Sequence, residues 1–106
     1  MKTTTMTTTE TPAQTITRLP IARTAPARAA FLRCIAAAER AADRGWTIRK
    51  GSVAPSARRS TVYIYATPTG GDERRIWEED TCFGGYNAPL TGPRLAHLES
   101  ALDDLA

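Results

Sequence analysis

Few side chains in this sequence have the chemistry for covalent or acid–base catalysis. The chain has one histidine, His97, and two cysteines. A serine or cysteine nucleophile needs a base, most often histidine, within hydrogen-bond reach. Ser100 follows His97 by one helical turn, but both lie on the predicted outer face of a helix. Cys34 lies in an apolar stripe and Cys82 at the end of a predicted strand, so neither thiol is expected to be activated. We therefore predict no catalytic residues and no enzymatic activity.

The acidic residues near the middle of the chain do not form a metal site by their spacing. Five carboxylates gather between residues 72 and 80, and three of them, Glu78, Glu79 and Asp80, are consecutive. Consecutive residues of a strand point to opposite faces, so these three cannot converge on one Mg²⁺ ion without a bulge. One histidine and two cysteines are too few for a zinc site of about four ligands. We predict no metal and no cofactor.

Basic residues are distributed unevenly along the chain. Residues 1–59 hold 11 basic and 3 acidic side chains, whereas residues 60–106 hold 3 basic and 8 acidic ones, so the halves carry +8 and −5 within a net charge of +3. Twelve of the 14 basic residues are arginine, which makes bidentate contacts to phosphate or carboxylate and stacks on aromatic rings. A GC-rich coding sequence would also enrich arginine and alanine, so the count alone does not establish binding.

The position of these arginines beside aromatic residues predicts a nucleic-acid interface in this small basic protein. Cations can contact several phosphates, and aromatic rings on a sheet can stack on bases. The predicted nucleic-acid-binding residues are Arg49, Lys50, Arg58, Arg59, Tyr63, Tyr65, Arg75 and Trp77. A secondary basic stripe, expected to face water or a partner, consists of Arg33, Arg40 and Arg44.

Two amphipathic segments predict the helices that would support this surface. Thr24 is a suitable N-cap, Pro26 suits a first turn, and no glycine follows until Gly45, which predicts a helix over residues 26–44. A second helix is predicted over residues 93–105. Its leucines share one face: Leu95, Leu98, Leu102 and Leu105.

Alternation of apolar and polar residues predicts three strands between the helices. The two-residue period recurs from Trp46 to Arg49, from Thr61 to Ala66 and from Arg74 to Asp80, and two glycines between the second and third segments suit a tight hairpin. We therefore predict an α+β fold with the order helix, three-stranded antiparallel sheet, helix (αβββα), and with both helices on one sheet face.

The same alternation assigns a side chain to each face of the sheet. The face under the helices is predicted to carry Trp46, Ile48, Val62, Ile64 and Ile76. The opposite face is predicted to carry Arg49, Tyr63, Tyr65, Arg75 and Trp77. That face is either open or covered, by the N-terminal segment 1–23 or by the glycine- and proline-rich loop 83–92, whose Phe83, Tyr86 and Leu90 could serve as a lid.

The N-terminal segment lacks a sustained apolar period. Seven of the first eleven residues are threonine, and prolines occur at positions 12 and 20. We predict that residues 1–23 form a disordered, threonine-rich tail and that residues 24–106 form a single small domain. Residues 1–11 contain no apolar run typical of a secretory signal, so a cytoplasmic location with reduced cysteines is expected, and no membrane association. A transit peptide is the alternative for this arginine-containing, acid-poor region.

Two functions remain open from the sequence. The first is a non-enzymatic module that contacts DNA or RNA through the arginine-rich first half and an exposed Tyr/Trp/Arg sheet face. The second is a protein-binding regulator or inhibitor, of the kind that accompanies mobile elements, which uses the same aromatic face or the 83–92 loop. Aromatic and arginine side chains are typical of both kinds of interface. The partner and the oligomeric state are not determined by the sequence.

Overall fold

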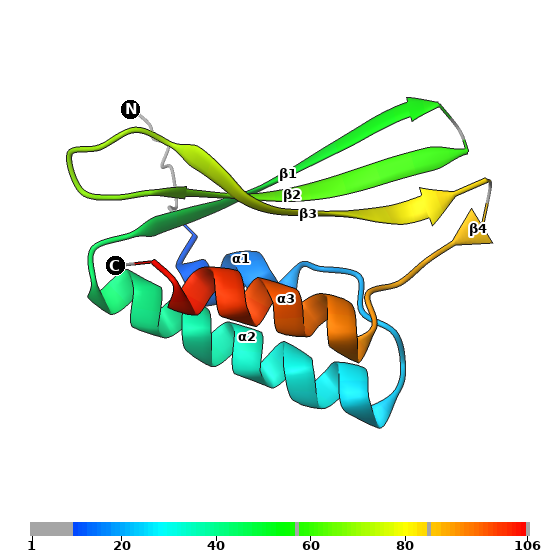
Figure 1. Cartoon of the computed structure of the whole chain (residues 1–106), viewed down its shortest axis with the longest axis horizontal. Helices are drawn as coiled ribbons and strands as arrows, with labels where there is room; N and C mark the ends of the chain where they lie inside the picture. The colour runs from blue at the N-terminus through cyan, green and yellow to red at the C-terminus, as the bar shows by residue number, and fades with distance from the viewer. Residues whose placement is uncertain (1–9, 57, 85, 106) are drawn as a thin grey trace, which may run out of the picture.

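The chain forms two layers, a four-stranded antiparallel sheet and a layer of helices on one of its faces (Figure 1). The computed structural model describes residues 10–56, 58–84 and 86–105. Along the chain the elements are α1 (Pro12–Thr17), α2 (Ala25–Asp43), β1 (Thr47–Ser56), β2 (Arg59–Thr67), β3 (Arg74–Phe83), β4 (Tyr86–Asn87) and α3 (Gly92–Asp103). Helices α2 and α3 pack against each other below the sheet (Figure 1), and the predicted α+β fold is confirmed.

Helix α2 begins and ends close to the predicted residues because its local signals are strong. The Thr24 hydroxyl accepts a hydrogen bond from the backbone N–H of Ala27 at 3.2 Å, and Pro26 lies in the first turn. At the other end, Gly45 has a φ of 90°, which a residue with a side chain rarely adopts. These caps confine the helix to one span across the sheet.

The sheet has the order β1-β2-β3-β4, with every neighbouring pair antiparallel. Ile64 of β2 pairs with Trp77, whereas the next residue, Tyr65, pairs with Arg75. Ile76 is therefore an extra residue in β3, that is, a β-bulge. A second irregularity lies between Ser60 and Thr61.

The bulge overturns the predicted face of Trp77 and leaves Ile76 on its predicted side, toward the helices. Because Trp77 pairs with Ile64, its side chain enters the core, where it is 8% exposed. Ile76 is partly buried at the edge of the same core. Strict alternation along β3 placed Trp77 on the open face, and the extra residue reverses that assignment.

The core lies between the sheet and the helices. Apolar side chains of β1 and β2 meet the alanine-rich face of α2 and the leucine face of α3, as predicted for Ile48, Val62 and Ile64. All four predicted leucines of the last helical segment are buried: Leu95, Leu98, Leu102 and Leu105. Small alanines on α2 allow the two helices to approach closely.

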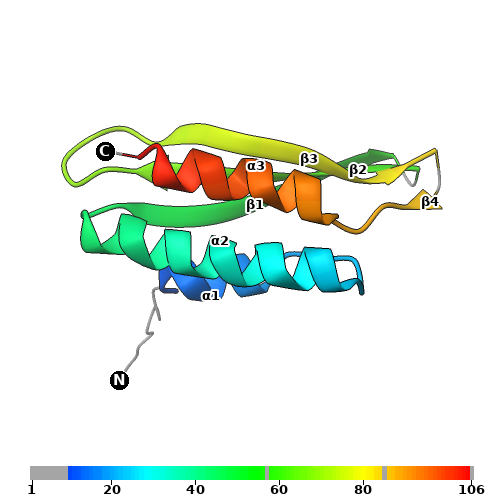
Figure 2. The ribbon, with the colours of Figure 1, turned by 60° about the horizontal axis from the view of Figure 1, so that its bottom comes forward.

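The segment before α2 is part of the folded domain, which corrects the predicted tail for residues 10–23. Helix α1 begins at a capping box in which Thr11 and Gln14 satisfy each other's backbone N–H groups. Ile16 is fully buried, and α1 packs against α2 and β1 (Figure 2). The Thr15 hydroxyl donates to the backbone carbonyl of Ile48 at 3.3 Å. The rest of the predicted tail, residues 1–9, lies outside the described residues.

The connection before α3 also closes the core. Leu90 is fully buried, its backbone N–H donates to the carbonyl of Pro20, and its carbonyl accepts from the N–H of Ala22, each at 2.8 Å. Leu90 is thus held on the helical side of the sheet by the α1–α2 connection, so it is not a lid over the opposite face. The side chains of the other two predicted lid residues, Phe83 and Tyr86, lie outside the described part of the structure.

Candidate interaction surface

The sheet face opposite the helices carries four of the eight residues that the sequence predicted for nucleic-acid binding. Antiparallel pairing places Arg49 of β1 beside Tyr65 of β2, and Tyr65 beside Arg75 of β3. None of the described segments lies over this face in either view of the ribbon (Figures 1 and 2). We call it the tyrosine–arginine face and define it by Arg49, Gly51, Tyr63, Tyr65, Glu73, Arg75 and Glu78.

Two tyrosine rings form the centre of this face. The ring centroids of Tyr63 and Tyr65 are 6.1 Å apart and the ring planes are inclined by 39°, within the range of favourable aromatic pairs. Gly51 of the neighbouring strand makes room for the second ring, because a Cβ atom there would lie 3.0 Å from Cε2 of Tyr65. The guanidinium carbon of Arg49 lies 4.3 Å from the Tyr65 centroid, and that of Arg75 lies 5.0 Å from the Tyr63 centroid. Both rings therefore have a stacked cation.

Each of these two arginines also has a carboxylate partner. Arg49 donates from Nε and Nη2 to the two carboxylate oxygens of Glu73 at 2.9 and 2.8 Å, a bidentate arrangement. These hydrogen bonds lower the pKa of Glu73 and raise the pKa of Arg49. Arg75 pairs with Glu78 at 3.4 Å. The tyrosine–arginine face thus carries two cations and two anions and is electrically balanced.

The predicted basic residues outside this face are dispersed. Arg58 donates to the backbone carbonyl of Gly84 at 3.0 Å, and Arg59 lies 3.8 Å from Asp80. Lys50 bonds the hydroxyl of Ser52 at 3.3 Å. Arg58 and Arg59 lie at the β1–β2 connection, whereas Lys50 pairs with Ile64, a core residue, so the three do not form one cluster with the tyrosine pair.

The predicted basic stripe of α2 lies beside α3, and its side chains pair with that helix while remaining partly exposed. Arg33 pairs with Glu99 at 3.0 Å, and Arg40 pairs with Asp103 through three hydrogen bonds of 2.9 to 3.1 Å. Arg44 donates to the carbonyl of Leu102 at 3.3 Å. The stripe therefore links the two helices, and its side chains are about half exposed in doing so.

Trp77, the eighth predicted binding residue, does not belong to the surface. Its indole Nε1 is buried and has no hydrogen-bond partner among the described residues. Sequence reasoning also missed Gly51, Glu73 and Glu78, which shape or neutralise the face. Glu78 lies beside Tyr63 because of the register between β2 and β3. That register depends on the bulge, so the position of Glu78 could not be predicted from strand alternation.

The residues with catalytic chemistry remain apart. Cys34 is buried, and its thiol donates to the carbonyl of Leu95 at 3.0 Å. Burial, with a smaller contribution from the charge of Glu99, raises the pKa of Cys34 to about 12, so this thiol is not a nucleophile near neutral pH. His97 is exposed on α3. Within the described ranges, no group of three or more histidine, cysteine or acidic residues could hold a metal ion, and no helix is long and apolar enough to cross a membrane.

Comparison of the chain with models of protein families, with curated proteins and with solved structures finds no match.

Proposed function

We propose that this protein is a non-enzymatic binding module that recognises another protein through its tyrosine–arginine face. The observation that carries the proposal is the pair of tyrosine rings, each with a stacked arginine whose charge is balanced by a glutamate. The described residues of the chain leave this face uncovered (Figures 1 and 2). A regulator or inhibitor without chemistry of its own would act through such a contact.

The residue types of this face are those that contribute most to protein interfaces. Tyrosine and arginine are enriched among the side chains whose truncation weakens protein complexes most. Here Gly51 and the stacked arginines hold the rings in place before any partner binds. A side chain that is already ordered loses less conformational entropy on association. Composition and preorganisation therefore both support recognition of a protein.

Contact with nucleic acid stays a prediction and receives less support from the same geometry. Glu73 and Glu78 lie among the arginines that phosphates would approach, well within a Debye length of about 8 Å. The burial of Trp77 leaves two aromatic rings on the face, and arginines already stack on both. Phosphate contacts would therefore require the arginines to exchange their glutamate partners.

The proposal is tested with a double variant that changes the two rings and keeps the sheet. In Tyr63→Thr/Tyr65→Thr, threonine retains a strong preference for strands but removes both aromatic surfaces. The matched control is Leu32→Ala on α2, which changes the side chain of an exposed residue in the helical layer. Tagged wild-type and variant proteins are used for affinity capture from the native host, with and without nuclease, and thermal unfolding checks that each variant is folded.

We expect wild type and Leu32→Ala to retain one protein in stoichiometric amount after nuclease treatment, and the double variant to lose it. Equal retention by the folded double variant would contradict a role for the tyrosine–arginine face. Loss of the captured material on nuclease treatment would support nucleic-acid binding instead.

A further inference from the structure

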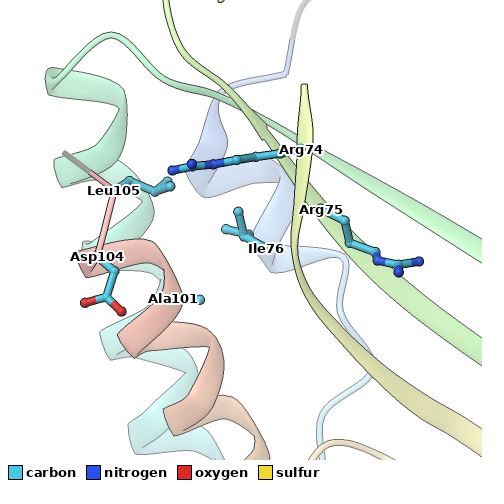
Figure 3. A pocket seen from close by; sticks show the side chains of 6 residues that line it. All are labelled: Arg74, Arg75, Ile76, Ala101, Asp104 and Leu105. Atoms are coloured by element: carbon cyan, nitrogen blue, oxygen red, sulfur yellow. The ribbon is translucent and has the colours of Figure 1, made fainter. Parts of the chain in front are cut away.

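A second site lies on the helix side of the sheet, where the start of β3 approaches the C-terminal end of α3 (Figure 3). It is an open pocket of about 340 Å³. Six residues line it: Arg74, Arg75, Ile76, Ala101, Asp104 and Leu105. In the close view, Arg74 reaches toward Leu105 over the pocket, whereas the adjacent Arg75 points to the opposite side of the strand.

The floor of this pocket is apolar because of the bulge in β3. Ile76 is the extra residue between the pairs Tyr65–Arg75 and Ile64–Trp77. Its side chain is directed toward α3, where it faces Ala101 and Leu105 (Figure 3). The small side chain of Ala101 leaves space that a larger residue on α3 would fill. The pocket therefore offers room for a short apolar chain.

Arg74 brings a positive charge to the pocket and forms no ion pair within the described part of the chain, although the carboxylate of Asp104 also lines the pocket. Its guanidinium carbon lies 5.2 Å from the ring centroid of Trp46, a stacked position that holds the group in place. The other arginines of β2 and β3 do form ion pairs, since Arg59 lies near Asp80 and Arg75 pairs with Glu78. A stacked guanidinium keeps its edge free for a planar anion.

We propose that this pocket binds a carboxylate attached to a short branched aliphatic chain. The carboxylate would accept hydrogen bonds from Arg74, and the aliphatic chain would lie against Ile76, Ala101 and Leu105. Such a group occurs at the end of a peptide that terminates in leucine, and in a free small carboxylic acid. Arg75 belongs to the tyrosine–arginine face and also borders this pocket, but its guanidinium points away from the pocket. The two sites therefore use different side chains, and the pocket goes beyond the function proposed above.

The site is tested by NMR titration of the isotope-labelled full chain with four probes. Two carry the carboxylate, 4-methylpentanoate and N-acetylglycyl-leucine, and two are the corresponding amides. We expect saturable shifts of the Ile76 methyl groups and the Trp46 indole N–H with one or both acids and none with the amides. Binding of the peptide alone assigns the site to a chain end, whereas equal binding of both acids assigns it to small carboxylates.

Adjacent arginines provide a matched pair of variants for the same titration. Arg74→Gln removes the proposed cation, and Arg75→Gln makes the same change on the other side of the strand. We expect Arg74→Gln to lower the affinity for the acid about tenfold or more, and Arg75→Gln to leave that affinity nearly unchanged. Asp104→Asn should strengthen binding, because it removes a negative charge from the lining.

Equal shifts with acids and amides, no saturable shift with any probe, or equal loss in both arginine variants would overturn the proposal. None of these results would alter partner capture by the tyrosine rings, so failure of the pocket and failure of the proposed function are distinguishable.

Discussion

The two cysteines illustrate how burial decides the chemistry of a single residue. Cys34 is fully buried, and its pKa is raised to about 12 from an ordinary value of 9.0, first by burial and then by the charge of Glu99. Cys82 is partly exposed at the end of β3. Because the thiolate is the reactive form, the two side chains should differ strongly in reactivity.

We expect one thiol of the folded protein, Cys82, to react with a thiol-specific disulfide reagent at about pH 8. Cys34 should react after denaturation. The Cys82→Ser variant should therefore show almost no fast reaction while folded. Rapid reaction of that variant would contradict the buried position of Cys34.

The raised pKa of Cys34 also predicts a loss of stability at alkaline pH. The folded state favours the neutral thiol, so its contribution is fully present below the unfolded pKa of 9.0 and is lost as pH rises toward about 12. In urea unfolding, Cys34→Ala should lose less stability than wild type across this range. An equal alkaline loss in the two proteins would show that other groups cause it.

Trp77 is the residue whose position most clearly separates core from surface. Because it is 8% exposed, Trp77→Ala should lower the free energy of unfolding by about 3–5 kcal/mol. Trp77→Phe should cost much less, since it keeps an aromatic ring and removes the unpartnered indole N–H. Urea unfolding measures both variants. Wild-type stability of the Trp77→Ala protein would contradict the buried position of Trp77.

At the scale of elements, the sequence predicts long segments with strong end signals. Helices expected over residues 26–44 and 93–105 form at Ala25–Asp43 and Gly92–Asp103. Helix α1 was missed because six residues give too short a periodic signal, and a helix of this length depends on tertiary packing. The bulge at Ile76 was missed because strand alternation contains no sign of an inserted residue.

These two omissions limit what could be predicted of the candidate site. Alternation alone places Arg49, Tyr63 and Tyr65 on one face correctly, since β1 and β2 pair without interruption over these residues. It fails beyond the bulge, at Trp77. The neutralising role of Glu73 could not be predicted either, because it depends on the position of the β2–β3 connection beside Arg49.

The packing of α1 leads to a prediction for residues once expected to be a tail. Ile16 is fully buried, so Ile16→Ala should destabilise the domain by about 2–4 kcal/mol. The exposed neighbour Thr17 supplies the control, because Thr17→Ala should change stability by about 0.5 kcal/mol or less. Chemical unfolding of both variants provides the measurement. Equal, small effects would mean that α1 does not belong to the cooperative unit.

At the scale of the whole molecule, the uneven charge of the sequence is balanced by contacts in the fold. Arginines from the basic first half pair with acidic residues of the second half in four described ion pairs: Arg33–Glu99, Arg40–Asp103, Arg49–Glu73 and Arg59–Asp80. The two halves of the sequence are therefore interleaved and do not form separate positive and negative poles. Such a distribution favours no single large phosphate-binding surface.

This charge balance predicts the behaviour of the protein with oligonucleotides. Fluorescence anisotropy with labelled single- and double-stranded probes should show weak binding at low salt that disappears at physiological salt. Arg58→Ala/Arg59→Ala should change it little, because Arg58 bonds a carbonyl and Arg59 lies near Asp80. Tight binding at physiological salt, with a salt slope that falls by about 0.9 for each lost phosphate contact in this variant, would instead support the nucleic-acid hypothesis.

The most direct test of a protein partner at the tyrosine–arginine face is site-specific photo-crosslinking in the native host. A photoreactive phenylalanine analogue replaces Tyr63 on this face or, as the control, Leu32, which is 61% exposed on α2. We predict a discrete, nuclease-resistant protein adduct from position 63 and none from position 32. A nucleic-acid adduct at position 63, or the same protein adducts at both positions, would contradict the proposed function.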